Sequence, residues 1–464
     1  MKTFNDFQKA GSRIDFIRAA IQEYRSGETY QLALIADEYD RQRNTTICQY
    51  TKYLYDTKGR KVVDQYSSNN RIASNFFRRL NTQRCTYSLG NGVAFSNDGV
   101  KERLGTDFDT QLYKAGYHAL IHGVSYGFWN EEEGNGKLYV FKATEFCPLL
   151  DEANGNLRAG IRFWSLGWLR KPVTAVLYEE DGYTVYRTVD GGSGLDLEEI
   201  EPKKAYKVRG MTSVADGFEF VGGENYSTLP IKQLYGSSLQ QSTLVGMREA
   251  IDSYDLIQSG FANNLQDCSE IYWLISGNFG MEMDETLKFM DKLRLQHVAN
   301  VDGENGSITP YVQEVPAQAR ETYLQTIQNQ IYSDFGAFNV HQLPGHQNTA
   351  TEINASYQPM DEEADDFEYQ VILFVRQILS LLGIDDTPIF KRNRISNQME
   401  QTEMIMSAVD VLDEETILRK LPWITDDEIE TIMKNRDAKA VSGMSGMSIL
   451  NQQMEEEQEE EEEE

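Results

Sequence analysis

Residues Gly123-Val124-Ser125-Tyr126-Gly127 match the G-x-S-x-G pattern, in which an activated serine attacks a carbonyl carbon. In hydrolases of that kind a strand precedes the serine and a helix follows it. Here the order is reversed, because residues 106–122 have helical apolar spacing and a short segment rich in β-branched and aromatic residues follows. We therefore favour a plain helix-to-strand turn, and keep a serine hydrolase using Ser125 as the alternative hypothesis.

Two histidines, His118 and His122, lie four residues apart on the same predicted helix, which is the spacing of two zinc ligands in a metalloprotease. Ala119 occupies the place of the glutamate that general-base catalysis requires, and the sequence indicates no third ligand. We expect a structural pair of histidines, one of them partly buried. No metal site is predicted.

Carboxylates are abundant, but their clusters, such as Asp365-Asp366 and Asp426-Asp427-Glu428, fall on predicted helix surfaces or caps. A two-metal nuclease would need acidic residues converging from strands. The chain also lacks a glycine-rich phosphate loop followed by Lys and Ser or Thr. The sequence therefore predicts no catalytic residues and no cofactor.

Composition narrows the class of protein further. The 464 residues carry a formal charge of −29, to which a final run of glutamates, Glu455–Glu464, contributes. So acidic a surface should not bind phosphate backbones, although it can line a conduit through which a polyanion passes. Four cysteines without paired spacing are expected to be reduced core residues, namely Cys48, Cys85, Cys147 and Cys268. No signal peptide or membrane span is predicted, so we expect a soluble protein made in the cytoplasm.

The first half of the chain predicts an α+β domain over residues 1–229. Two short helices broken at Ser26-Gly27 are expected in residues 1–40, followed by helices over Ser67–Thr86 and Thr106–His122. Six short segments then predict a single antiparallel meander: Gly123–Trp129, Lys137–Lys142, Phe146–Asp151, Leu157–Trp164, Thr174–Tyr178 and Tyr183–Thr188. Pro230 is expected to close this domain.

The second half predicts two helices that flank a small α/β insert, and these helices can run antiparallel. The expected elements are helix Gly246–Gln266, strand Ile271–Ser276, helix Asp284–Gln296, strands His297–Asp302 and Ser307–Val315, and helix Ala317–Phe335. A loop, Gly336–Asn348, precedes a long helix. A short strand over Pro388–Arg394, further helices from Asn397, and a disordered tail from Val441 complete the chain.

The long helix is predicted over Thr349–Gly383. Its apolar residues alternate at steps of four and three: Ile353, Tyr357, Met360, Ala364, Phe367, Val371, Phe374, Ile378 and Leu381. This spacing lays an apolar seam along roughly 50 Å of helix, and Pro359 should kink it. We expect the seam to need a neighbouring helix along its whole length, which favours an architectural protein built from packed helices.

The order of these elements resembles that of the portal (head-to-tail connector) proteins of tailed bacteriophages, in particular the type found in long-tailed phages of Gram-positive hosts. The resemblance covers roughly Ser67–Asn435. The matching stretches are Asn69–Ile72 through Gly90–Gly92, Ala115–Tyr117 through Gly123–Gly127, Leu229–Ile231, Ile251–Asp255 with Ser259, Thr349–Ile353, Asp413–Thr416 and Leu421–Asp426. The loop departs from many relatives at Asn348-Thr349, where they have Ser-Gly.

The resemblance implies an α+β portal fold whose subunits form a ring of twelve. Its parts would be a wing (residues 1–229), stem helix 1 (230–267), a clip (268–315), stem helix 2 (316–335), a tunnel loop (336–348), a long wing helix with its returning strand (349–394), a helical crown (395–440) and a disordered acidic tail (441–464). By family analogy, the tunnel loop would face DNA through Asn339, His341, Gln342, His346, Gln347 and Asn348. The clip would dock partners through Asp284, Glu285, Lys288, Asp291, Lys292, Arg294, Glu304 and Asn305.

The resemblance also implies a non-enzymatic function and a set of partners. The ring would occupy one vertex of the capsid in the virion, after assembly in the cytoplasm of the host bacterium. It would bind the terminase large subunit, a head-completion or adaptor protein, and the major capsid and scaffolding proteins. Double-stranded DNA would pass through its channel without sequence specificity during packaging and ejection. No membrane is implied, and a non-viral ring scaffold is a further alternative.

Overall fold

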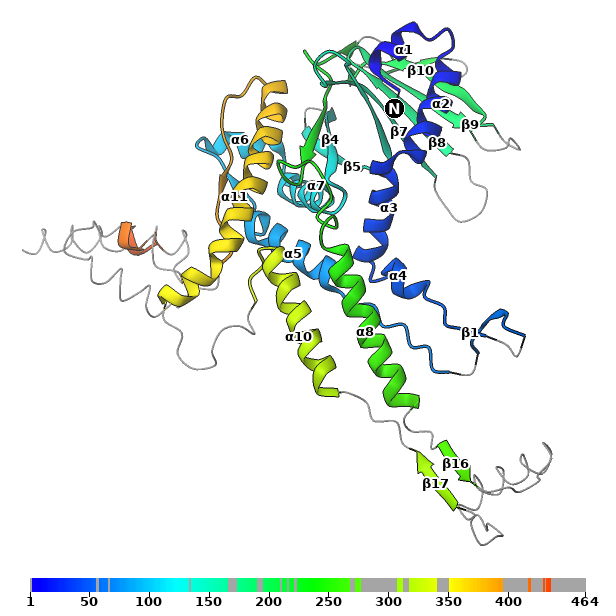
Figure 1. Ribbon diagram of the computed structural model, residues 1–464. Coiled ribbons are helices and arrows are strands. Elements are labelled where there is room, and N and C mark those ends of the chain that lie inside the picture. Colours follow the sequence, from blue (N-terminus) through cyan, green and yellow to red (C-terminus); the bar gives the residue numbers. More distant parts are fainter. Residues whose placement is uncertain are drawn as a thin grey trace, which may run out of the picture. The chain divides into compact units, whose positions relative to one another are not determined.

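The structure is a computed structural model of the 464-residue chain. It describes residues 2–55, 58–65, 67–132, 135–165, 173–189, 195–208, 211–214, 217–220, 223–267, 272–276, 307–311, 317–339, 350–394, 416–418, 429 and 431–434. The chain divides into two compact units, Met1–Asn339 with Gln358–Asn393, and Val340–Tyr357 with Arg394–Glu464. Most described helices and strands belong to the first unit (Figure 1).

Three helices form the N-terminal part of the first unit: α1 (Phe4–Lys9), α2 (Arg13–Ser26) and α3 (Glu28–Asp40). Thr3 and Ser12 begin the first two, each accepting a hydrogen bond from a backbone N–H three residues on. The predicted break at Ser26-Gly27 is confirmed, because α2 ends at Ser26 and Gly27 has extended backbone angles. A single turn, α4 (Thr45–Cys48), follows.

The strands form two principal sheets, so the prediction of a single meander was wrong. One sheet has five strands in the order β10 (Leu197–Lys204), β9 (Gly182–Thr188), β8 (Val173–Glu179), β7 (Leu157–Ser165) and β6 (Phe146–Leu150). The other has three, in the order β15 (Ile231–Tyr235), β4 (Val124–Glu132) and β5 (Asn135–Lys142). A turn at residues 143–145 separates the sheets, and β15 occupies the remaining edge of β4. The second sheet thus extends past the domain boundary predicted at Leu229.

The five-stranded sheet is buried on both faces. Along β8, Val176 and Tyr178 join one apolar cluster, while Ala175 and Leu177 join another on the opposite face. This is the consequence of the two-residue repeat of a strand. The second cluster also holds the apolar side of α2, including Ile17, so α2 covers this face of the sheet.

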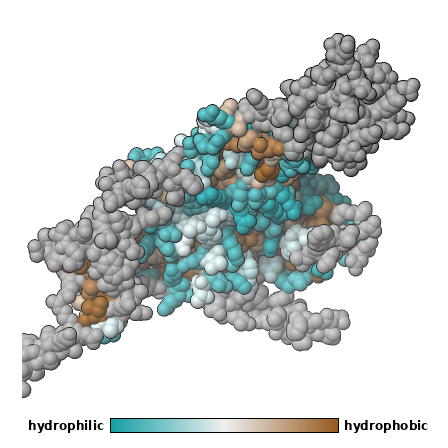
Figure 2. All heavy atoms as spheres, turned by 90° about the horizontal axis from the view of Figure 1, so that it is seen from below, coloured by the Kyte–Doolittle hydropathy of each residue, from teal (hydrophilic) through white to brown (hydrophobic). Residues whose placement is uncertain are grey.

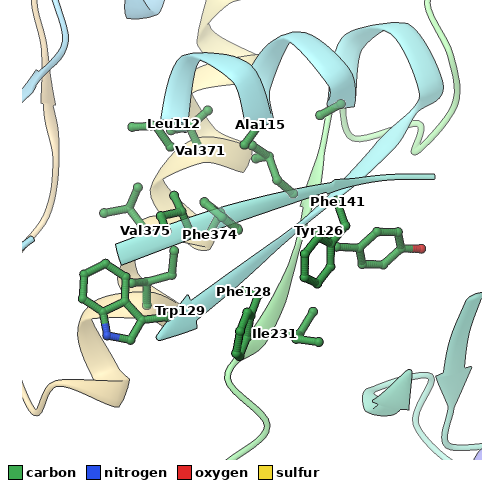
Figure 3. Close-up of a cluster of buried hydrophobic side chains, with 14 of the residues drawn as sticks. Leu112, Ala115, Tyr126, Phe128, Trp129, Phe141, Ile231, Val371, Phe374 and Val375 are labelled. Atoms are coloured by element: carbon green, nitrogen blue, oxygen red, sulfur yellow. The ribbon is translucent and has the colours of Figure 1, made fainter. Parts of the chain in front are cut away.

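The largest apolar cluster lies between the three-stranded sheet and two helices, α7 (Phe108–His122) and α11 (Ala350–Leu381) (Figure 3). Figure 3 shows side chains from both helices and from β4, β5 and β15 converging there. Trp129 and Phe141 are fully buried in this cluster. The α+β architecture that the sequence predicts is confirmed.

The long helix is confirmed as α11, with Pro359 inside it. Its predicted need for a neighbouring helix along its whole length was wrong for the described C-terminal half. Phe374 packs against Gly127 of β4, and Phe367 lies over Gly116 of α7. A β-carbon at Gly116 would come within 2.9 Å of the Phe367 ring, so these glycines admit the aromatic side chains. From Phe367 to Ile378 the seam is therefore buried within the chain's own core.

The segment after α11 returns along its acidic face and is held there by Arg392. The guanidinium donates to Glu368 at 3.0 and 2.9 Å and to Asp361 at 2.9 Å, and it also binds Asp365. Asp365 lies on the exposed surface of α11, as the sequence predicts, with 70% of its side chain exposed, and it also binds Arg392 there. These charge-assisted bonds fix the short strand β18 (Ile389–Phe390), which pairs with β3 (Val93–Ala94).

The helix predicted over Ser67–Thr86 begins only at Phe76, as α5 (Phe76–Leu89). Residues 70–74 instead run along α8 (Arg248–Asp267) outside any helix. Their alternate backbone N–H groups donate to side chains one helical turn apart on α8, which we call the side-chain ladder: Asn70 to Asn263 at 2.6 Å, Ile72 to Ser259 at 3.0 Å, and Ser74 to Asp255 at 2.9 Å.

The ladder fits because two different repeats have nearly the same length. Two residues of extended chain advance about 6.6 Å, and four residues of α-helix advance about 6.0 Å. Asp255, Ser259 and Asn263 are buried, and the oxygens that accept from the extended segment would lose these partners without it, although Asp255 also accepts from Asn44. Tertiary hydrogen bonding thus overrides the local helical pattern of residues 67–75.

The remaining described elements are shorter or lie apart from these sheets. They are β1 (Tyr53–Tyr55), β2 (Lys61–Val63), α6 (Asp98–Leu104), β11 (Lys207–Val208), β12 (Met211–Val214), β13 (Gly217–Phe220), β14 (Gly223–Glu224), β16 (Tyr272–Ser276), β17 (Ser307–Tyr311) and α10 (Ala317–Asp334). Strands β16 and β17 pair antiparallel. No described helix is long and apolar enough to cross a membrane.

Removing ladder oxygens should destabilise the protein. In Ser259→Ala and Asn263→Ala the N–H groups of Ile72 and Asn70 lose their acceptors, which should lower the free energy of unfolding by about 1–3 kcal/mol each. Urea unfolding measures this. Gln258→Ala, a neighbouring substitution on α8 outside the ladder, is the matched control, and an equal loss in all three variants would contradict the role of the ladder.

Candidate functional site

Ser125 is the second residue of β4 and follows the turn at Gly123 that ends α7. The side chain is fully buried, with 0% exposure, and its hydroxyl donates to the carbonyl of Ala115 at 2.8 Å. Gly123 ends α7 with a φ of 86°, which favours glycine, and a β-carbon there would lie 2.8 Å from the backbone nitrogen of Ser242. A glycine at the turn and a short hydroxyl side chain at the start of β4 account for Gly123 and Ser125 without a nucleophile.

The two histidines form a stacked pair, with ring centroids 5.7 Å apart and planes inclined by 5°. Nε2 of His122 bonds to Oδ1 of Asp37 at 2.9 Å, and Nζ of Lys142 lies 3.9 Å from the same oxygen. This agrees with the structural pair predicted from the sequence, although His122 is fully buried as well as paired. The part of the chain that the structure describes has no group of three or more His, Cys, Asp or Glu side chains suited to a metal.

Burial controls the charge of this pair. It lowers the pKa of His118 to about 3, and neighbouring His122 and Lys142 act in the same direction. Burial alone would raise the pKa of Asp37, but the hydrogen bond and charge of His122, together with Lys142, hold it below its usual value. The cluster therefore has a neutral His118 beside an ionised Asp37 at neutral pH.

Of the residues expected to face DNA, only Asn339 lies in the described part of the chain, where its side chain is buried, with 7% exposure. The others lie outside the described residues: His341, Gln342, His346, Gln347 and Asn348. The same holds for all those expected to dock partners: Asp284, Glu285, Lys288, Asp291, Lys292, Arg294, Glu304 and Asn305. Their positions stay predictions.

The helices α8 and α10 lie side by side and run antiparallel (Figure 1). Ile251, near the start of α8, shares an apolar cluster with Ile331, near the end of α10. At the other end, the guanidinium of Arg320 is directed to the carbonyl of Gly260 at 3.4 Å and lies 5.8 Å from the ring of Phe261. The antiparallel arrangement that the sequence allows for these helices is therefore present.

A broad face of α10 is exposed, polar and almost uncharged. Two of its threonines donate within the helix, Thr322 to the carbonyl of Gln318 at 2.9 Å and Thr326 to that of Thr322 at 2.8 Å. Arg320 is the only basic residue of α10, and it is directed toward α8. The exposed polar residues are Gln318, Glu321, Thr322, Gln325, Thr326, Asn329, Gln330, Ser333 and Asp334. Such a face presents amide and hydroxyl groups without a cation for phosphate.

Sequence reasoning missed one surface. The ribbon of β1 and β2, which we call the hairpin ribbon, exposes large apolar side chains, including Tyr55 at 75%. The signal was available, since Tyr53-Leu54-Tyr55 and Lys61-Val62-Val63 flank Gly59 at hairpin spacing.

Comparison with known proteins gives the family. The chain matches the family model "Phage portal protein, SPP1 Gp6-like" over residues 32–464. The chain belongs to this family of phage portal proteins.

Similar portal proteins occur in two phages. The chain is 23% identical to the portal protein of Clostridium phage phiCD119 over 429 residues, covering 84% of this chain and 92% of that protein. It is 24% identical to the portal protein of Bacillus phage SPP1 over 423 residues, covering 84% and 81%. Among solved structures, a chain from "Neck of native GTA particle computed with C12 symmetry" matches 75% of this chain and 89% of its own, at 11% identity and a TM-score of 0.43. Similarity at that TM-score adds nothing to the family assignment.

The histidine cluster should make stability depend on pH. Unfolded His118 takes up a proton below about pH 6.5, whereas the folded side chain, with its pKa lowered to about 3, does not. The free energy of unfolding should then be highest above pH 6.5 and fall by up to about 1.4 kcal/mol per pH unit below it. Urea unfolding from pH 7 to pH 4.5 measures this, and His118→Gln should reduce the slope. An unchanged slope would exclude His118 as its source.

Proposed function

We propose that this chain forms a dodecameric ring at one vertex of a phage capsid, where it is the channel for DNA packaging and ejection. The observation that carries the proposal is the family match over residues 32–464. The antiparallel pair α8 and α10 supports it, because α10 keeps a broad face free of contacts within the described chain. That face is available to line a channel or to contact another subunit.

The charge distribution supports passage of DNA rather than its retention. The chain carries −29, and the exposed face of α10 bears carboxylates but no exposed basic side chain. Retention of DNA needs cations that displace counterions from phosphates. A channel lined by amides, hydroxyls and a few carboxylates would let the duplex slide without sequence specificity.

We further propose the contacts of the loop and the insert. In the tunnel loop, His341, Gln342, His346, Gln347 and Asn348 would touch the passing duplex, and buried Asn339 would fix the start of the loop. The clip would bind the terminase large subunit and later a head-completion or adaptor protein, through Asp284, Glu285, Lys288, Asp291, Lys292, Arg294, Glu304 and Asn305. The major capsid and scaffolding proteins would contact the ring at the capsid vertex, after synthesis in the bacterial cytoplasm.

A structural function without catalysis is part of this proposal. The alternative, a hydrolase using Ser125, requires a solvent-accessible hydroxyl beside a base. Ser125 is fully buried and donates to a backbone carbonyl, which disfavours that alternative. Family membership likewise disfavours a non-viral ring scaffold.

The proposed ring has a defined mass. Twelve copies of the 53.0-kDa chain should give a species of roughly 636 kDa in native mass spectrometry, with a central hole in negative-stain images. A monomer or dimer that persists at high concentration and with scaffolding protein added would contradict the ring.

Adding a cation to the loop tests the channel. His341→Lys should slow DNA translocation several-fold, because each subunit then offers a permanent charge to the phosphates. Packaging of DNA into proheads measures the rate, and the effect should weaken as salt rises. Gln22→Lys, on the exposed side of α2, adds the same charge elsewhere and should package at the wild-type rate. Equal rates for both variants would argue against contact between the loop and DNA.

A further inference from the structure

The hairpin ribbon concentrates exposed apolar side chains on both of its faces. Tyr53 and Val63 are cross-strand partners on one face, and Leu54 and Val62 on the other. All of these, together with Tyr55, are exposed. By contrast, the coloured residues seen in Figure 2 are largely hydrophilic, with separate hydrophobic areas.

The base of the ribbon is held firmly on α8. On the side before β1, the hydroxyl of Thr46 donates to Asp252 of α8 at 2.6 Å. On the side after β2, residues 70–74 are bound through the side-chain ladder, and the guanidinium of Arg71 donates to the carbonyl of Cys48 at 2.9 Å. Figure 1 shows β1 standing away from the two principal sheets. The ribbon is therefore a projection with a fixed base.

Two features of the ribbon require a partner. A two-stranded ribbon is only marginally stable in water without packing on one face. Within the described residues, no third strand pairs with β1 or β2, so each strand has an edge available for pairing. Apolar faces and open edges together fit a protein surface, since a phosphate backbone buries neither.

The charge of the hairpin ribbon indicates which protein surface it binds. Residues 50–65 contain four basic residues, Lys52, Lys58, Arg60 and Lys61, against Asp56 and Asp64, a net charge of +2 in a chain of −29. The ribbon is thus complementary to the acidic surface of another copy of the chain. Part of the basic character supports the ribbon itself, because Nζ of Lys61 lies 3.9 Å from the centre of the Tyr53 ring.

We propose that the hairpin ribbon is an arm that docks on an acidic surface of a neighbouring copy of this chain and stabilises the ring. This inference rests on the proposed ring. In the ring the neighbour stands at a fixed distance from the base of the arm, so docking is effectively intramolecular. Leu54, Tyr55 and Val62 would be buried by the neighbour.

The first experiment uses a photo-crosslinking residue. Full-length chain carrying benzoylphenylalanine in place of Tyr55 is assembled from an equal mixture of isotopically light and heavy copies and then irradiated. Mixed light–heavy crosslinked dimers, joined to an acidic segment, are expected in ring fractions and should vanish on dilution to monomer. Crosslinks confined to one copy, crosslinks to packaged DNA or to another virion protein, or no crosslinks in intact rings would each overturn the arm.

The second experiment measures assembly. Leu54→Asp combined with Val62→Asp should raise the concentration for half-assembly by more than about tenfold, since buried apolar anchors dominate interfaces. Leu239→Asp, at a side chain 73% exposed and outside the ribbon, is the matched control and should assemble like wild type. Circular dichroism and thermal unfolding of the unassembled chain should be unchanged in both variants, because the substituted side chains are exposed.

These outcomes distinguish failure of the proposed arm from failure of the proposed ring. If the double variant forms rings at the same concentration as the wild type, only the arm is refuted. Wild-type chain that forms no ring at any concentration would refute both proposals.

Discussion

The polar side of α8 is the constraint on which much of this structure depends. Asp255, Ser259 and Asn263 recur every four residues and are buried, so each needs a hydrogen-bond partner. The extended chain of residues 70–74 supplies backbone N–H groups at nearly the same spacing. This pairing fixes where α5 begins and where the hairpin ribbon has its base. Ile251 in the first turn of α8 packs on α10. The helix α8 therefore contacts both α10 and the extended residues 70–74.

Elements with a strong internal period could be predicted from the sequence. The helices α7, α10 and α11 and the strands β4–β9 lie within a few residues of their predicted bounds. The segment 70–74 along α8 could not, because Ile72 lies at helical spacing from Phe76 while its backbone partner, Ser259, is 187 residues away. The two sheets were also missed, since the pairing of β15 with β4 joins residues about a hundred positions apart. Local patterns carry no information on such partners.

For the long helix α11, the sequence predicted the element but not what packs against it. Its apolar seam was identified correctly, but its partner was not, because an apolar stripe does not specify which element covers it. Gly116 and Gly127 held the missing information: they leave room for Phe367 and Phe374 on α7 and β4. Only the fold reveals that these two glycines face the same helix. The seam is thus no argument for lateral partners along the described C-terminal half.

In the candidate site too, some features could be predicted from the sequence and others could be seen only in the structure. The order of helix and strand alone predicted a helix-to-strand turn next to Ser125, whereas the hydrogen bond that its hydroxyl donates to Ala115 could be seen only in the structure. Arg392 gave no signal, because its three carboxylate partners are 24 to 31 residues away in the sequence.

Charge links the two proposals made for this chain. A channel for DNA works only if its walls do not hold phosphate, and the exposed face of α10 offers no basic side chain. A ring of strongly acidic subunits must also overcome mutual repulsion, which is considerable at −29 per chain. Basic residues gathered on a projection such as the hairpin ribbon address the second requirement without compromising the first. The position of the basic residues thus matters more for this protein than their number. A lysine in the channel would retard DNA, whereas a lysine on the hairpin ribbon would attract the acidic surface of a neighbouring subunit.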